Sequence, residues 1–175
     1  MKKVLIAIGA LVLVLVVGGL FLPNKYTASA TYEFKHSKER LHGLIGNLET
    51  WREWGPWMED DPGMKIELIG PSGVGAKQIW TSRKAGNGSL TFTKWDPESG
   101  ITYDLEFDGW PRATAGFEYQ DIEGGVRVHW SMDGKVAVPV IGGYLALFFK
   151  KMISSSFEQG LKNIDNVLSK NENNN

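Results

Sequence analysis

The sequence predicts an α+β domain in which a sheet of about seven antiparallel strands accompanies a long C-terminal helix, with one apolar helix in front of the domain. Three observations predict this arrangement. Residues 64–135 form short runs of alternating apolar and polar positions, separated by turns rich in glycine and proline, which favours an antiparallel meander. Residues 143–168 carry apolar residues at helical spacing. Residues 4–22 contain no charged residue, as a membrane-spanning helix requires.

Length and composition fit a single folded domain. The chain has 175 residues, of which 42% are hydrophobic, enough for one core. Its 19 basic and 20 acidic residues nearly balance, and setting aside Lys2 and Lys3, which precede the apolar run, leaves 17 against 20. This slightly acidic domain argues against nucleic-acid binding, which needs clustered positive charge. The absence of cysteine excludes disulfides, thiolate catalysis and cysteine-ligated metals.

Residues 1–23 are predicted to form a membrane anchor. The run Val4–Leu22 would be about 28 Å long as a helix, close to the hydrocarbon thickness of a bilayer. The alternative is a secretory signal peptide cleaved after Ala30, where the sequence TASA offers a cleavage site. The run exceeds the usual length of a signal core, and cleavage there would divide a strand-like segment. We therefore favour a retained anchor, although the sequence leaves the mature N-terminus open.

The charges that flank this run predict its orientation. Lys2, Lys3 and the terminal amine precede it, whereas Lys25 alone follows closely. The positive-inside rule then predicts a single-pass membrane protein with a cytoplasmic N-terminus. The folded domain would be extracytoplasmic, either periplasmic or on the outer face of the cell.

The folded domain is predicted to occupy residues 24–169 and to begin with a strand and a helix. Residues 26–35 alternate, and the apolar face carries Tyr26, Ala28, Ala30, Tyr32 and Phe34. Ser37 can cap a helix that reaches about Leu48, because apolar residues recur there at helical spacing.

Three of the seven tryptophans lie in the segment WREWGPW, residues 51–57. Trp51 and Trp54 are three positions apart, so a second short helix places them on one face, and we assign both to packing. Gly55-Pro56 prevents that helix from reaching Trp57, which must leave in another direction. We therefore expect Trp57 at the mouth of an apolar pocket, since indole combines a broad apolar face with one N–H donor.

Six further strands are expected, at residues 64–69, 76–82, 89–95, 101–107, 113–119 and 126–135. The clearest alternation predicts one apolar and one polar face for the sheet. The pattern does not decide on which face Trp80 and Trp95 lie. A long helix at Gly143–Leu168 follows, and residues 170–175 are predicted to be a disordered tail because they have nothing to bury.

Six sequence blocks fill this order of elements: LIGNLETWREWGPW, GVGAKQIW, GNGSLTF, YDLEF, GVRVHWSMDG and FEQGLKNI. Over residues 25–168 the chain resembles the START-like helix-grip superfamily (SRPBCC proteins), which includes polyketide cyclases/dehydrases and lipid-transfer domains, and in particular its bacterial membrane-anchored subgroup. The resemblance implies a curved sheet wrapped on the long helix, with a hydrophobic ligand cavity between them. These motifs specify the fold well and the chemistry poorly.

Large apolar side chains from both layers are expected to line such a cavity. They are Trp57, Phe92, Tyr103, Leu105, Phe107, Phe117, Tyr119, Val128, Trp130, Phe149, Met152 and Phe157. The alternative is that these side chains fill a solid core, because protein interiors pack to nearly crystalline density.

The sequence contains no recognisable catalytic constellation. The three histidines, at positions 36, 42 and 129, lack metal-ligand spacing, so we expect neither a metal nor a cofactor. The carboxylates of Asp104, Glu106 and Asp108 share the polar face of one strand and fit a solvated surface. The serines at 154–156 lack the setting of a nucleophile elbow and are expected to let the helix approach the sheet.

Several functions remain compatible with the sequence. The favoured one is a membrane-anchored module that binds or presents a lipid or another hydrophobic small molecule. The alternatives are a cavity enzyme of the polyketide cyclase/dehydrase type, acting by general acid/base catalysis, and a protein-interaction role in which the cavity is vestigial. The sequence determines neither the ligand nor the oligomeric state.

Overall fold

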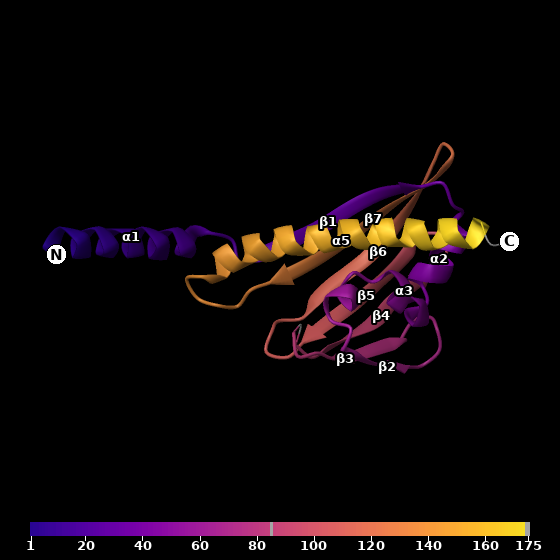
Figure 1. Ribbon diagram of the computed structural model, residues 1–175, viewed down its shortest axis with the longest axis horizontal. Coiled ribbons are helices and arrows are strands. Elements are labelled where there is room, and N and C mark those ends of the chain that lie inside the picture. Colours follow the sequence, from indigo (N-terminus) through magenta and orange to yellow (C-terminus); the bar gives the residue numbers. More distant parts are fainter. Residues whose placement is uncertain (85, 174–175) are drawn as a thin grey trace.

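The computed structural model describes residues 1–84 and 86–173 (Figure 1). The chain forms, in order, α1 (Lys2–Phe21), β1 (Lys25–Phe34), α2 (Lys38–Ile45), a 3₁₀ turn (Leu48–Thr50), α3 (Trp51–Trp54), α4 (Trp57–Asp60), β2 (Lys65–Ile69), β3 (Lys77–Thr81), β4 (Gly88–Asp96), β5 (Gly100–Phe107), β6 (Ala113–Ile122), β7 (Gly125–Lys135) and α5 (Gly142–Asn173). This is the predicted α+β order.

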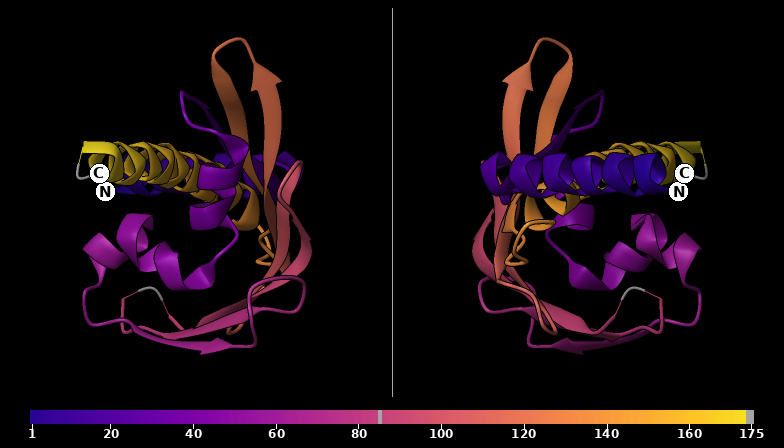
Figure 2. Two further views of the ribbon diagram at one scale, coloured as in Figure 1. Left: turned by 90° about the vertical axis from the view of Figure 1, so that its right-hand side faces the viewer. Right: turned by 90° about the vertical axis from the view of Figure 1, so that its left-hand side faces the viewer.

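The seven strands form one antiparallel sheet in the order β1-β7-β6-β5-β4-β3-β2. Consecutive strands from β2 to β7 are neighbours, as in a meander, and β1 closes the row beside β7. The sheet bends strongly, and α5 and the short helices α2 to α4 lie on its concave side (Figure 2). The predicted curved antiparallel sheet wrapped on a long helix is therefore confirmed.

The C-terminal end of α2 explains much of the tryptophan content. The last carbonyls of a helix have no partner within the helix and need donors from elsewhere. Trp51 Nε1 donates to the carbonyl of Ile45 at 2.9 Å, and Trp54 Nε1 donates to that of Leu44 at 3.4 Å. Both indoles are buried, so Trp51 and Trp54 pack the core and cap α2 at once.

Trp95 lies on the inner face because of a β-bulge. The pairing of β4 with β5 shifts between Phe92 and Lys94, which inserts one residue and reverses the alternation after it. Trp95 therefore points to the same face as Phe92 and donates from Nε1 to the Gly46 carbonyl at 2.8 Å. Alternation alone cannot place Trp95, because the bulge has no signature in the sequence.

Helix α5 packs along the concave face through Phe157, Leu161, Ile164 and Leu168, all of which are buried. Gly160 allows the closest approach, because a Cβ there would lie 2.8 Å from the Trp130 ring and 3.2 Å from Pro56. The helix continues to Asn173, so the predicted end at Leu168 is too early and the helix enters the segment expected to be a disordered tail. Residues 174–175 lie outside the described residues.

Helix α1 extends away from the domain and is exposed along nearly its whole length (Figure 1). It is the one helix among the described residues that is long and apolar enough to cross a membrane. Its last turns lie beside the start of α5, where Tyr144 Oη donates to the Leu15 carbonyl at 3.0 Å.

Candidate functional site

The candidate site is the layer between the concave face of the sheet and α5. Most of the predicted lining residues meet there and are buried: Phe92, Tyr103, Leu105, Phe117, Tyr119, Val128, Trp130 and Phe157. Trp57, Phe107 and Phe149 are partly buried. Met152 lies instead at the edge of the inward face of α5 and is 46% exposed, because that face runs through Phe149, Ile153 and Phe157 at four-residue spacing.

Trp130 is the centre of this layer. Its ring is stacked between two phenylalanines, with centroids 3.9 Å from Phe157 and 4.4 Å from Phe117. Its Nε1 donates to the hydroxyl of Tyr103 at 2.9 Å, so the one polar atom of the indole is satisfied inside the core. We call Phe117, Trp130, Phe157, Leu161 and Ile164 the closed end, because rings and aliphatic side chains fill it without exposing any of these residues.

The opposite end of the layer is less enclosed. We call Phe107, Trp110, Phe149 and Ile153 the open end, where Phe107, Phe149 and Ile153 are partly buried and Trp110 is 44% exposed. The Trp110 ring packs edge-on against Phe149 at 5.6 Å. Both the β5–β6 turn and the start of α5 lie at the end of the domain from which α1 leaves (Figure 1). The large apolar side chains at this end therefore keep part of their surface exposed to solvent.

Trp57 begins α4 and lies beside the closed end. Its ring is 6.0 Å from Trp130 and 6.2 Å from Trp51. It remains partly exposed, as a residue at a mouth would be. Its role in ligand entry stays a prediction.

Burial favours the neutral forms of Tyr103, Tyr119 and His42 in the interior. Burial raises the pKa of the Tyr103 hydroxyl and that of Tyr119. Burial also lowers the pKa of His42, against a smaller opposing effect from the Asp96 carboxylate. The His42 Nδ1 lies 3.4 Å from Tyr119 Oη, and its buried Nε2 has no hydrogen-bond partner within the described part of the chain. These groups add polarity without charge to an apolar interior.

The carboxylates singled out in the sequence lie on the convex face of the sheet. Arg112 forms ion pairs with Asp104 and Glu106, and His129 Nδ1 lies 2.9 Å from Thr31 Oγ1 on the same exposed side. His36 is buried at the end of β1, with its Nε2 3.4 Å from Asp165 Oδ1 on α5. Among the side chains that the structure describes, there is no group of three or more histidine or acidic residues that could hold a metal.

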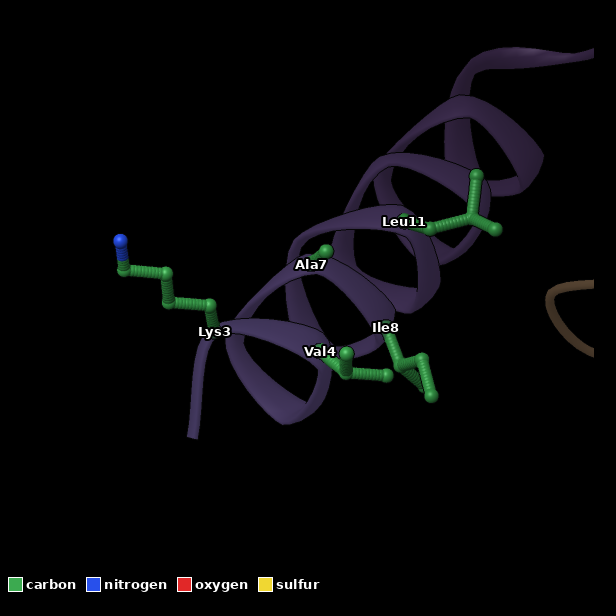
Figure 3. Close-up of a pocket in the computed structure, with 5 residues that line it drawn as sticks. All are labelled: Lys3, Val4, Ala7, Ile8 and Leu11. Atoms are coloured by element: carbon green, nitrogen blue, oxygen red, sulfur yellow. The ribbon is translucent and has the colours of Figure 1, made fainter. Parts of the chain in front are cut away.

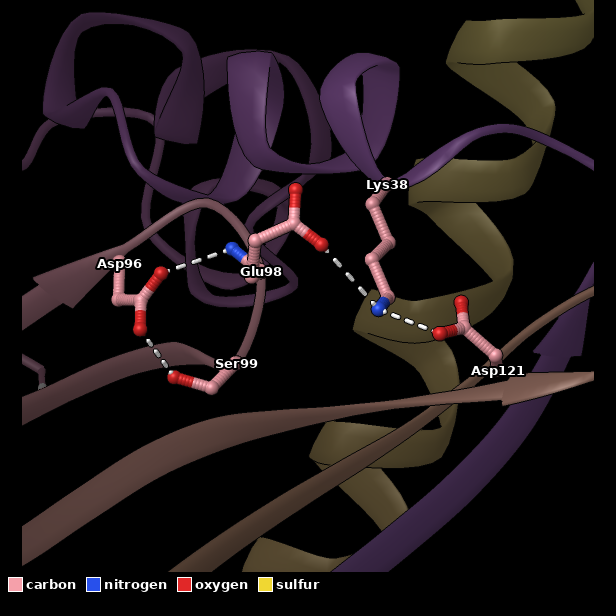
Figure 4. A network of polar contacts seen from close by, with 5 residues as sticks. All are labelled: Lys38, Asp96, Glu98, Ser99 and Asp121. Atoms are coloured by element: carbon pink, nitrogen blue, oxygen red, sulfur yellow. Dashed lines mark hydrogen bonds and ion pairs between the residues drawn. The ribbon is translucent and has the colours of Figure 1, made fainter.

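Two surface hollows lie outside this layer. One, of about 370 Å³, is lined only by residues of α1, namely Lys3, Val4, Ala7, Ile8 and Leu11 (Figure 3). A hollow between side chains of one exposed apolar helix is a surface that acyl chains can fill. The other, of about 490 Å³, is polar and includes Lys38, Glu98 and Asp121 at the end of the domain opposite α1. There Lys38 Nζ lies 2.8 Å from Asp121 Oδ2 and 3.5 Å from Glu98 Oε2 (Figure 4).

Sequence reasoning missed some residues on the concave face. Trp80 is buried and its ring lies 5.3 Å from Phe107, yet its strand gives no clear alternation because the polar Gln78 shares its face and is equally buried. Ile66, opposite Trp80 in the sheet, is partly buried against the core. Its strand is short and otherwise exposed, so only the pairing with β3 reveals it.

Comparison with solved structures identifies the same fold in several bacterial proteins. They include a protein of unknown function, SA2116, from Staphylococcus aureus (TM-score 0.68, 11% identity, 85% of this chain and 96% of that chain). They also include TTHA0849 from Thermus thermophilus (0.62, 19%, 80% and 94%) and XoxI from Bacillus cereus (0.60, 17%, 81% and 94%). At these identities the similarity establishes the fold alone.

Sequence comparison identifies the family of the chain, although no curated protein sequence matches it. Residues 26–169 match the family model described as polyketide cyclase / dehydrase and lipid transport, which covers nearly the whole sheet and most of α5. The resemblance to this family inferred from the sequence blocks is thereby confirmed, and the family fold suggests an apolar ligand-binding layer between sheet and helix. The chain belongs to the polyketide cyclase / dehydrase and lipid transport family.

Proposed function

We propose that this protein is a membrane-anchored binding module that takes up a lipid or another hydrophobic small molecule between the sheet and α5. The observation that carries the proposal is the gradient along that layer, from the closed end around Trp130 to the open end around Phe107 and Phe149. Partly exposed large apolar side chains gain free energy, about 25 cal/mol per Å², when a ligand covers them. Family membership supports the same activity.

The anchor supports the choice of a lipid. Helix α1 has the length and composition of a membrane span, and the open end lies on the side of the domain where α1 emerges (Figure 1). An apolar molecule could then pass from the bilayer into the layer without crossing much water. The lysines before the helix favour a cytoplasmic N-terminus and an extracytoplasmic domain.

The interior offers a ligand little catalytic chemistry. Burial raises the pKa of the Tyr103 and Tyr119 hydroxyls and lowers that of His42, which makes the two tyrosines weaker acids and the histidine a weaker base. The carboxylates of Asp104 and Glu106 are on the convex face, paired with Arg112. Binding therefore accounts for the arrangement better than a cyclase or dehydratase reaction.

Photo-cross-linking tests this proposal. The full chain is reconstituted into vesicles that contain a phospholipid with a diazirine on its acyl chain, irradiated and mapped by peptide mass spectrometry. Cross-links are expected on peptides of β5, β7 and the middle of α5, in addition to α1. Phe107→Asp should remove the interior cross-links, since it places a carboxylate where solvation is poor.

Glu106→Gln is the matched control, because it changes the neighbouring residue on the convex face and should leave the cross-links intact. Cross-links confined to α1 in the unaltered chain would contradict binding in the interior. A ligand recovered in chemically altered form would favour the enzyme alternative.

A further inference from the structure

The connection between β7 and α5 and the first turns of α5 form an unusually apolar tip. Residues 136–149, VAVPVIGGYLALFF, contain no charged side chain and are followed directly by Lys150 and Lys151. Several of the large side chains face solvent, with Ile141 52%, Leu147 52% and Phe148 60% exposed. A soluble domain rarely presents such a contiguous apolar surface without a partner.

The tip is fixed against the last turns of α1. A Cβ on Gly19 would lie 2.0 Å from the Val140 carbonyl oxygen, and one on Gly143 would lie 2.3 Å from the Leu22 side chain. Only glycine at both positions permits this approach. With the hydrogen bond from Tyr144 to Leu15, these contacts hold the tip at a defined level along α1.

That level can be compared with the bilayer. If α1 spans the hydrocarbon, Val140 lies beside Gly19, inside the end of the span, and Gly143 lies beside Leu22 at its boundary. Helix α5 runs onward in nearly the same direction as α1 (Figure 1). At 1.5 Å per residue, Phe148 is then roughly 8 Å beyond Gly143, which is the depth of the headgroup region.

Charge and aromatic residues around the tip match that depth. Lys150 and Lys151 follow the apolar run, and Lys25 lies directly opposite Lys135 in the β1–β7 ladder beside the emergence of α1. All four lysines are exposed. Tyr144 and Trp110 lie nearby, and tyrosine, tryptophan and lysine are the residues that concentrate at membrane interfaces.

The backbone at the tip gives independent support. Val140 has φ 64°, the one positive φ of a residue other than glycine within the described ranges. A β-branched residue in this region is strained, and strain of this kind persists only where the surrounding structure fixes the backbone, as the contact with α1 does here. Glycine would relieve the strain but would remove an apolar side chain from the tip.

We infer that the tip, residues 136–149, is a second membrane-embedded element, which inserts into the phospholipid leaflet on the domain's side while Lys25, Lys135, Lys150 and Lys151 contact the headgroups. The inference rests on the anchoring part of the proposed function. It makes the domain lie on the bilayer surface with its open end at the headgroups, rather than hang from a flexible tether.

The chain has no cysteine, so single cysteines can report depth. Phe148→Cys, Leu13→Cys in the middle of α1 and Glu123→Cys in the distant β6–β7 turn are each labelled with a small fluorophore in the full chain. The proteins are reconstituted into vesicles of phosphatidylcholine and phosphatidylglycerol that carry a doxyl quencher on the acyl chains. We expect loss of fluorescence at Leu13→Cys and Phe148→Cys and none at Glu123→Cys. Leu147→Cys serves as a second tip site if Phe148→Cys does not fold.

The outcomes separate the tip from the anchor. Quenching at Leu13→Cys with a water-exposed Phe148→Cys would overturn the tip inference and leave the anchor standing. Absence of quenching at Leu13→Cys would overturn the anchor itself. A Phe148→Cys label shielded from aqueous iodide but untouched by doxyl lipid would indicate a second copy of the chain on the tip, and would also overturn the inference. Lys150→Gln with Lys151→Gln should reduce quenching at Phe148→Cys in phosphatidylglycerol vesicles only, since neutral lipid gives those lysines no partner.

Discussion

The two ends of the layer between sheet and α5 are built from the same residue types and differ in enclosure. At the closed end Trp130 is stacked between Phe117 and Phe157, and all three side chains are almost fully buried. At the open end Phe149 touches Trp110 and Tyr26 edge-on and stays partly exposed. The closed end therefore supplies stability, and the open end retains apolar surface for a ligand or a bilayer.

The first consequence concerns two phenylalanines on one helix, eight residues apart. Phe157→Ala should lower the free energy of unfolding by about 3–5 kcal/mol, because it leaves a cavity against a stacked indole. Phe149→Ala should cost about 1 kcal/mol, since its ring is only partly buried. Urea unfolding of the full chain in a nonionic detergent, followed by circular dichroism, measures both. Equal losses would show that the two ends do not differ in packing.

The sequence predicts this architecture well because alternation along β5 and β7 and helical spacing along α5 each reflect burial on one face. It predicts the filling of the layer poorly. Whether Trp130 lines a void or a stack depends on the approach of α5, which Gly160 sets from another element. The positions of Trp95 and Trp80 depend on a bulge and on a buried glutamine, and the exposure of Met152 depends on the rotation of α5. Each is a tertiary property without a local signal.

The second prediction concerns the pH dependence of the free energy of unfolding, which depends on the burial of His42. His42 is buried against Trp95 and Tyr119, and burial lowers its pKa below the value of about 6.5 that it has when unfolded. The unfolded chain then binds the proton more tightly than the folded one, so the stability should fall as the pH drops below about 6.5 and level off below the folded pKa. His42→Gln should remove this part of the pH dependence, whereas His129→Gln on the convex face should preserve it. Identical pH profiles for His42→Gln and the unaltered chain would contradict the assignment.

The smallest expected effect tests whether the concave and convex faces are assigned correctly, on which the comparison of the two ends depends. His129 lies on the convex face beside Thr31, and Glu106 pairs with the exposed Arg112. His129→Ala and Glu106→Gln should each change the free energy of unfolding by under about 0.5 kcal/mol, as expected of solvated sites and surface ion pairs. Both variants should also retain the interior cross-links to acyl chains, because neither side chain reaches the layer under α5. A folded His129→Ala protein that loses those cross-links would place the histidine toward the ligand. The convex face would then need to be reconsidered as the binding surface, and an acid/base role for its histidine and carboxylates would regain support.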